Sequence, residues 1–346
     1  MKTTATHLVA RAYRAPSWLP GGHAQTIYAA RLAACPRVTY RRETWDTPDG
    51  DQIAIDFADP APTRERHPPY SGTGRPEHPR KTASPLVVLF HGLEGDSQSH
   101  YARATMAALQ ARGWRGAVVH FRGCGGLENR LPRAYHSGDD TEIDWILKRM
   151  RLLAGEQALH AVGISLGGNA LATWAGRRGA EAASCINSAV AVSAPQDLAA
   201  GAAALAKGFS RLYAESFLRS LRLKAQRLNQ RHPGLIDTAK ATQARTFHDF
   251  DDAVTAPLHG FRNAQDYWSQ SSCRRWLRGV EVPLLMLNAR NDPFLPESAL
   301  AAQAEVSKSV RLEYPANGGH VGFPSGLSGY PGWLPERVLH FFDRNG

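Results

Sequence analysis

From residue 85 onward, short apolar runs alternate with helix-forming segments. The runs are rich in Val, Ile, Leu and Ala and span 85–90, 116–121, 159–165, 188–194, 282–289 and 309–315. Predicted helices lie at 99–113, 139–155, 166–179, around 297–306 and near 332–343. Apolar strands joined by crossover helices form a parallel sheet with both faces covered. The sequence therefore predicts an α/β fold with a mostly parallel sheet and helices on both faces.

The pattern is different in three other regions. Residues 37–58 carry β-branched and aromatic residues on either side of an Asp-Gly turn, which predicts a β-hairpin. Residues 58–85 are rich in Pro, Gly and charge, which is typical of a surface loop. Residues 196–276 read as helical throughout, between two sheet strands, where lids and caps are inserted. We expect a core of residues 1–195 and 277–346 and a helical cap of residues 196–276.

The chain has 346 residues and a formal net charge of +10 at pH 7. Clustered Lys and Arg attract phosphates, but here the basic residues are spread along the chain, so nucleic acid is not the expected partner. No run approaches the roughly 20 apolar residues of a membrane span. Thr, His and Arg interrupt the amino terminus where a signal peptide would be apolar. We expect a cytoplasmic protein.

The four cysteines, Cys35, Cys124, Cys185 and Cys273, show no C-x-x-C spacing and no accompanying pairs of histidines. Such spacing would indicate zinc, and a disulfide framework would need a smaller, cysteine-rich chain. We therefore expect no metal and no organic cofactor.

The run Gly-Ile-Ser-Leu-Gly at 163–167 matches the pattern in which a nucleophilic serine lies on a sharp turn between a strand and a helix. An apolar strand is predicted before it and a helix after it. Small residues at 163, 167 and 168 allow such a turn to close, because a Cβ would collide across it. Ser165 is the candidate nucleophile.

A serine nucleophile needs a base that is oriented by a third group. In the chain order that accompanies this turn, an acid and then a histidine follow, each after a late strand. Asp292 comes after the predicted strand 282–289, and His320 comes after 309–315. We expect His320 to act as general base and then acid, and Asp292 to fix its tautomer and stabilise its charged form.

The oxyanion of an acyl-transfer reaction also needs hydrogen-bond donors, each contributing on the order of 3 kcal/mol. One expected donor is the backbone N–H of Leu166, which follows the serine. The other lies in the loop Phe-His-Gly-Leu-Glu-Gly after the strand 85–90, with Leu93 as the donor.

Several distinctive stretches run almost from end to end of the chain: GGHAQTIYAARL, TPDGDQIAIDF, LFHGLEGDSQSHYAR, HFRGCGGLENRLPRAYHSGDD, VGISLGGNALATW, FDDAVTAPLHGF, ARNDPFLP and GGHVGF. In these stretches the chain resembles the YheT-like branch of the α/β-hydrolase superfamily, which includes ABHD-type lipid hydrolases and yeast medium-chain ester synthases. By position, Ser165, Asp292 and His320 match the charge-relay residues of that branch. The resemblance implies an α/β-hydrolase fold and hydrolysis of esters of short- or medium-chain acyl groups, with monoacylglycerols among the candidate substrates.

The residues themselves indicate only acyl-transfer machinery, so two alternatives stay open. One is an acyltransferase that makes esters from acyl-CoA and an alcohol. The other is a binding protein that has kept the fold without the activity.

Residues 209–231 interleave Leu and Phe with six basic residues. We favour a cap helix that covers the site with its apolar face, over a helix resting on an anionic membrane. Nearby, Asp249, Asp251 and Asp252 are expected to form a solvated acidic cluster rather than a metal site.

Overall fold

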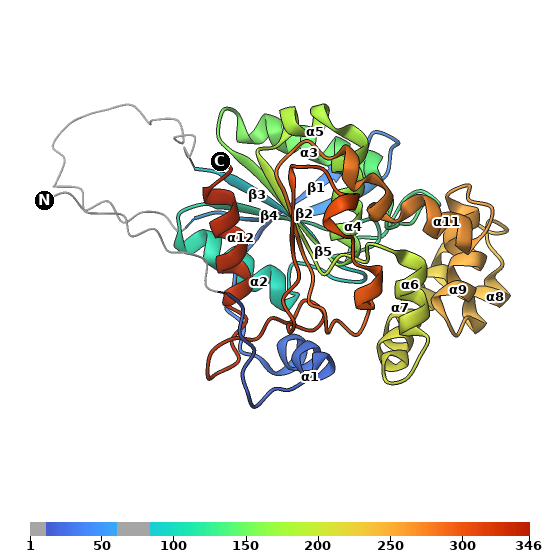
Figure 1. Ribbon diagram of the computed structural model, residues 1–346. Coiled ribbons are helices and arrows are strands. Elements are labelled where there is room, and N and C mark those ends of the chain that lie inside the picture. Colours follow the sequence, from blue (N-terminus) through green and yellow to red (C-terminus); the bar gives the residue numbers. More distant parts are fainter. Residues whose placement is uncertain (1–11, 61–83) are drawn as a thin grey trace, which may run out of the picture.

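The computed structural model describes residues 12–60 and 84–346 (Figure 1). Its centre is an eight-stranded sheet in the order β1-β2-β4-β3-β5-β6-β7-β8. β2 runs antiparallel to β1 and β4, and the other neighbouring pairs are parallel. The strands are β1 (Arg41–Asp46), β2 (Gln52–Ala58), β3 (Leu86–Phe90), β4 (Arg115–Val119), β5 (Leu159–Ile164), β6 (Ser188–Val192), β7 (Leu284–Leu287) and β8 (Val310–Glu313). The predicted hairpin is confirmed as β1 and β2.

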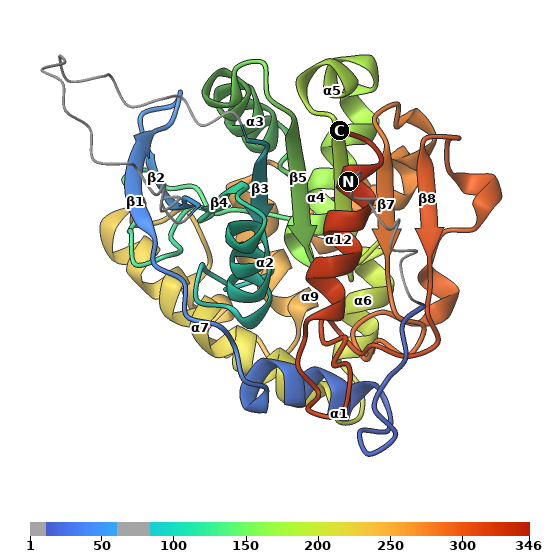
Figure 2. The same cartoon turned by 90° about the vertical axis from the view of Figure 1, so that its left-hand side faces the viewer.

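Helices cover both faces of the sheet, as predicted (Figures 1 and 2). One face carries α2 (His100–Ala111) and α12 (Trp333–Asp343). The other carries α3 (Asp140–Ala154), α4 (Leu166–Arg178) and α5 (Ala180–Cys185). An additional helix, α1 (Gly22–Ile27), lies at the edge of the sheet where the parallel strands end (Figure 2).

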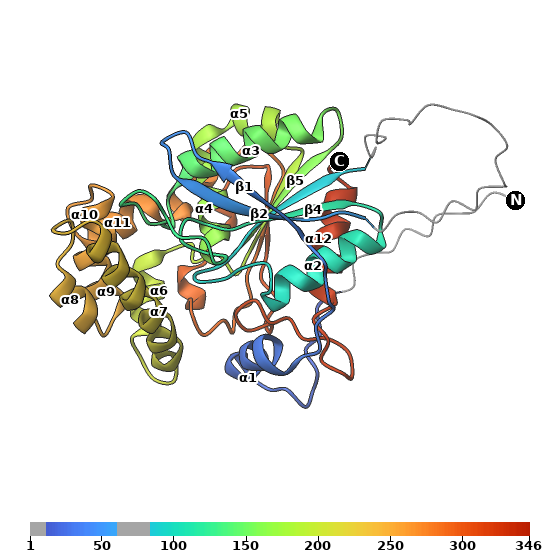
Figure 3. The ribbon, with the colours of Figure 1, turned by 180° about the vertical axis from the view of Figure 1, so that it is seen from behind.

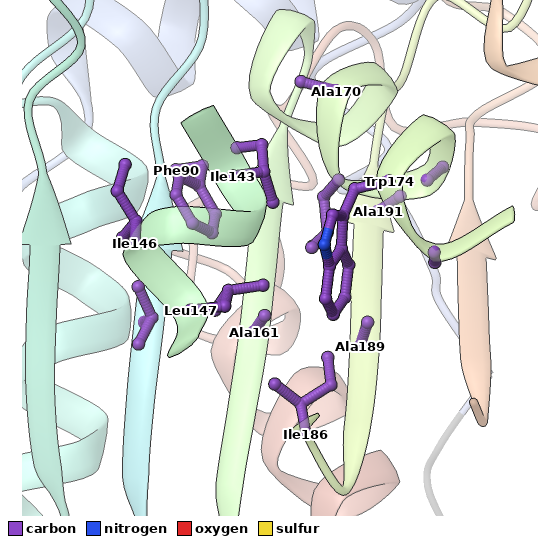
Figure 4. Packing of buried hydrophobic residues seen from close by; sticks show 14 of the residues in the cluster. Phe90, Ile143, Ile146, Leu147, Ala161, Ala170, Trp174, Ile186, Ala189 and Ala191 are labelled. Carbon is purple, nitrogen blue, oxygen red and sulfur yellow. The ribbon is translucent and has the colours of Figure 1, made fainter. Parts of the chain in front are cut away.

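Strand β3 shows how the core fixes this arrangement. Successive side chains of a strand point to opposite faces. Val88 and Phe90 accordingly pack with α3 and α4, while Val87 and Leu89 pack with α2 and α12. Figure 4 shows Phe90 close to α3 and the large Trp174 of α4 standing over the neighbouring strands. Because this packing fixes α4 on the sheet, the turn that precedes α4 also has a fixed position.

Between β6 and β7 the chain is helical and extends away from the sheet (Figures 1 and 3). Its elements are α6 (Leu198–Leu205), α7 (Ser210–Arg231), α8 (Thr238–Gln243), α9 (Phe247–Phe250), a π-helical turn (Asp251–Thr255), α10 (Ala256–Leu258) and α11 (Ala264–Ser271), followed by a 3₁₀ segment (Cys273–Gly279). These helices pack around small hydrophobic clusters of their own. Even α7, with 22 residues, lacks the apolar character of a membrane span, and so does every other helix in the described ranges.

The prediction of a helix around 297–306 is wrong, because only two short 3₁₀ segments form there, Glu297–Ala299 and Gln303–Glu305. The residues between them are extended, and the buried Gln196 side chain accepts the N–H of Ala301 at 2.8 Å, which competes with a helical hydrogen bond. Most of the loop predicted at 58–85 lies outside the described residues.

Candidate active site

Ser165 lies at the turn between β5 and α4. Its φ of 51° and ψ of −117° are unusual for a residue with a side chain, and such backbone strain costs roughly 1–3 kcal/mol. A Cβ on Gly163 would collide with the backbone of Gly167, and a Cβ on Gly167 would collide with the carbonyl groups of Phe90 and His91. The glycines are therefore required for the turn to pack this closely against β3.

Two loops bring His320 and Asp292 to this serine. Asp292 follows β7 and His320 follows β8, so all three side chains lie at the carboxyl edge of the parallel strands. His320 Nε2 is 3.0 Å from Ser165 Oγ, and His320 Nδ1 is 2.9 Å from Asp292 Oδ2. Because a carboxylate only accepts, Nδ1 carries the proton and Nε2 is free to accept the hydroxyl proton of Ser165. The three predicted residues thus form one hydrogen-bonded chain.

Phe294 contacts two members of this chain, a role that sequence reasoning missed. Its backbone N–H donates to Asp292 Oδ1 at 2.8 Å. Its ring stacks on the imidazole of His320, with centroids 4.0 Å apart and an interplanar angle of 14°. The ring also contacts Tyr213 of α7, with centroids 4.9 Å apart. In the sequence, the only indication of this role is the position of Phe294 two residues after Asp292.

Helix α1 supports the loops that follow β7 and β8. The hydroxyl of Thr26 accepts the backbone N–H of His320 at 2.8 Å. The buried Gln25 Oε1 accepts the N–H of Gly318 at 2.8 Å and the side-chain amide of Asn291 at 3.0 Å. Nothing in the composition of the GGHAQT stretch indicated this function.

Both expected oxyanion donors, Leu93 and Leu166, line the same cavity as Ser165 and His320. Leu166 is the first residue of α4, so its N–H has no acceptor within the helix. The N–H of Leu93 belongs to the peptide group whose carbonyl is that of Gly92. The oxygen of this carbonyl accepts hydrogen bonds that hold the plane of the peptide group, and they therefore fix the direction of the N–H.

The fixed carbonyl of Gly92 accepts from two groups. His91 Nδ1 lies 2.7 Å from it, and the N–H of Gly95 lies 3.0 Å from it. His91 Nε2 accepts the N–H of Phe121 at 3.1 Å, so its proton is on Nδ1. Burial lowers the pKa of His91 to about 3, so the ring is neutral and keeps this tautomer at physiological pH.

A cavity of about 240 Å³ extends from Ser165 and His320 beneath the helices that follow β6. Its wall is largely apolar and includes Leu198, Ala202, Leu205, Phe217, Leu221, Leu228, Phe247, Phe250, Val254, Leu258, Tyr267 and Trp268. Three of these come from the apolar face predicted for residues 209–231, whereas Leu212 of that helix is 62% exposed. The arrangement suits an apolar chain attached to the group that reacts at Ser165.

Asp251 also lines this cavity, and its predicted exposure to solvent is wrong. The π-helical turn buries its carboxylate, which accepts from Thr255 Oγ1 at 2.6 Å and from Trp268 Nε1 at 2.8 Å. Burial raises the pKa of Asp251 to about 6. Sequence proximity to exposed Asp249 and Asp252 gave no sign of this difference.

Asp251→Asn is expected to stabilise the protein above pH 7. With a raised pKa, the folded state binds more protons than the unfolded state between about pH 4 and 6, so wild-type stability falls as the pH rises through this range. Asparagine does not ionise, and it can accept from Trp268 with its oxygen while its amide donates to the Thr255 hydroxyl. The gain at pH 8 is therefore on the order of 2 kcal/mol and vanishes near pH 4. Urea unfolding at both pH values measures it, with Asp252→Asn as the control. A gain equal at both pH values would contradict the explanation.

Within residues 12–60 and 84–346, no three His, Cys, Asp or Glu side chains are grouped so as to hold a metal ion. The four cysteines are free. Asp139, beside the half-buried His136, caps the amino terminus of α3 by accepting the N–H of Glu142.

Comparison with known proteins adds to the geometry. Residues 85–327 match the family model described as alpha/beta hydrolase fold. The putative esterase YheT of Escherichia coli is 34% identical over 319 residues, which cover 91% of this chain and 88% of that protein. Phospholipase ABHD3 of mouse is 26% identical, over 92% of this chain and 75% of its own. The solved esterase Pf2001 of Pyrococcus furiosus aligns with a TM-score of 0.54 at 15% identity, over 91% and 99% of the two chains.

Proposed function

The chain belongs to the α/β-hydrolase fold family, in the branch of the putative esterase YheT, and from this premise we propose that it is a serine esterase. Its substrates are carboxylic esters of short- to medium-chain acyl groups, monoacylglycerols among them. The observation that carries the proposal is the hydrogen-bonded chain from Asp292 through His320 to Ser165, at 2.9 and 3.0 Å, at the end of an apolar cavity.

In the first step, Ser165 Oγ attacks the ester carbonyl while His320 Nε2 takes its proton. The carbonyl oxygen becomes an oxyanion, which accepts from the N–H groups of Leu93 and Leu166. When the tetrahedral intermediate collapses, the imidazolium returns the proton to the leaving alcohol. The acyl group stays on Ser165 as an ester.

In the second step, water takes the place of Ser165 as the nucleophile. His320 takes a proton from water, hydroxide attacks the acyl carbon, and the carboxylic acid leaves as the proton returns to Ser165. Asp292 stabilises the imidazolium in both steps and keeps its ring oriented.

The helices between β6 and β7, residues 196–276, act as the cap. Support for this comes from the cavity wall, because most of its apolar residues belong to these helices. The acyl chain lies along this wall, and the length of the cavity limits the length of the chain.

The test is a series of p-nitrophenyl esters of increasing acyl length. We expect kcat/KM to rise from acetate to a medium-chain optimum, since each buried methylene contributes about 0.8 kcal/mol, and to fall once the chain is longer than the cavity. Equal rates for all lengths would contradict the placement of the acyl chain, and the absence of any turnover would contradict the esterase itself.

Two further measurements separate the alternatives. With a medium-chain acyl-CoA and ethanol, an acyltransferase yields the ethyl ester and a hydrolase yields the free acid. A fluorophosphonate probe labels Ser165 of an active hydrolase, while a binding protein that has kept only the fold remains unlabelled.

Contact with an anionic membrane would use the outer face of α7. That face exposes Leu212 and Leu223, at 62% and 53%, together with the exposed Arg227 four residues after Leu223. Salt-sensitive sedimentation with phosphatidylglycerol vesicles, absent with phosphatidylcholine vesicles, is the expected sign of such contact.

A further inference from the structure

Glu94, the residue after Leu93, has an unusual backbone and a fully engaged side chain. Its φ is 56°, one of five positive values at non-glycine residues in the described ranges. Such a conformation persists only where the surroundings enforce it. The enforcing contacts come from two parts of the molecule, the core and the cap.

On the core side, the contacts are with Tyr135, in the loop between β4 and α3. The backbone N–H of Glu94 donates to the Tyr135 hydroxyl at 2.9 Å. That hydroxyl in turn donates to Glu94 Oε1 at 2.7 Å. The peptide group that follows Leu93 is thereby fixed, just as the peptide group before it is fixed through the carbonyl of Gly92. The peptide group that contains the Leu93 N–H and the peptide group that follows it are therefore both restrained.

On the cap side, the contacts are with α7. Lys224 Nζ lies 2.6 Å from Glu94 Oε1, and the hydroxyl of Ser220 donates to Glu94 Oε2. Lys224 and Ser220 are four residues apart, so they lie on the same face of the helix. The carboxylate of Glu94 thus binds two consecutive turns of α7. It belongs to the loop at 91–95 after β3, called the oxyanion loop below.

Charge makes Glu94 the main partner of Lys224. The ammonium also contacts Cys124 Sγ, at 3.3 Å, and lies 5.6 Å from the centroid of the Tyr135 ring. Burial raises the pKa of Cys124 to about 11, so the thiol is neutral at physiological pH. The side chain of Glu94 is only 11% exposed and that of Lys224 is 35% exposed, so water screens the pair only in part.

We propose that Glu94 is a positioning residue through which the seated cap, by way of Lys224, holds the oxyanion loop in its active geometry. The inference rests on the proposed esterase function. When the ammonium of Lys224 moves away, the largely buried carboxylate of Glu94 has no countercharge and turns toward water. It then no longer accepts from Tyr135, and the N–H of Leu93 loses one of its two restraints, the one on the peptide group that follows Leu93. Seating of the cap and assembly of the oxyanion hole are therefore one event.

Lys224→Met tests the link, because methionine keeps an apolar stem of similar length and removes the charge. A displacement of about 1 Å at a reaction centre can lower the rate on the order of 100-fold, so we expect kcat to fall about 10- to 100-fold. The factor should be the same for p-nitrophenyl acetate as for the octanoate, because the oxyanion is common to both. Arg219→Met, at an exposed position of the same helix, is the matched control and should leave kcat unchanged.

Glu94→Gln should lower kcat in the same way, and the double variant with Lys224→Met should lose no more than the single variants, because the two residues act as one unit. A loss confined to octanoate would overturn the link, since it would show that Lys224 only supports the acyl wall. Losses that simply multiply in the double variant would overturn it as well.

Hydrogen exchange of the Glu94 amide provides a readout that is independent of turnover. We expect faster exchange in Lys224→Met than in the wild type and no change in Arg219→Met. Unchanged exchange in Lys224→Met would overturn the link whatever the activity. If the wild type hydrolyses no ester, the proposed function fails, while the exchange measurement still tests the link.

Discussion

Ser165→Ala is expected to lower kcat for ester hydrolysis by about 10⁵- to 10⁶-fold, because the variant has no nucleophile for the acyl-enzyme and leaves water to attack unaided. The residual rate reflects binding and the oxyanion donors. Hydrolysis of the preferred p-nitrophenyl ester measures the effect, with a burst of nitrophenol in the wild type that is absent in the variant.

The matched control is Ser184→Ala, in the exposed part of helix α5. It should retain wild-type kcat. Both variants should melt near the wild-type temperature, since alanine at residue 165 adds no atoms to the tight turn. Activity of Ser165→Ala within tenfold of the wild type would show that another group attacks the ester.

The sequence predicted the fold and the three side chains of the hydrogen-bonded chain, Ser165, His320 and Asp292, because each prediction rests on a local pattern. Apolar strands and crossover helices define the sheet, and the carboxyl ends of parallel strands meet at one edge. A serine after β5, an acid after β7 and a histidine after β8 must therefore approach one another. The glycines around Ser165 follow from the same local argument.

The supporting residues were not predictable, because their partners are far away in the sequence. Gln25 bonds Gly318, and Lys224 bonds Glu94 across 130 residues. No periodicity encodes such pairs. The predicted exposure of Asp251 was wrong for a related reason, because its burial depends on how the π-helical turn packs against Trp268. Its two acidic neighbours remain exposed.

Asp292→Asn tests the orientation of the imidazole and is expected to lower kcat about 10⁴-fold. The N–H of Phe294 already points at one oxygen of residue 292, so the carbonyl of an asparagine must face it. The amide NH₂ then faces His320 Nδ1, which must accept and therefore carries no proton. The ring adopts the other tautomer, and Nε2, now protonated, donates to Ser165 instead of taking its proton.

The opposite orientation of the asparagine amide is unfavourable, because its NH₂ would then face the N–H of Phe294 and two donors would oppose each other. We therefore expect kcat to fall while KM changes little, since residue 292 is separated from the substrate by the imidazole. Asp343→Asn, at an exposed ion pair on α12, is the control. A fall of less than tenfold in Asp292→Asn would mean that the carboxylate does not set the tautomer, and the hydrogen bond of His320 to residue 292 would then be structural only.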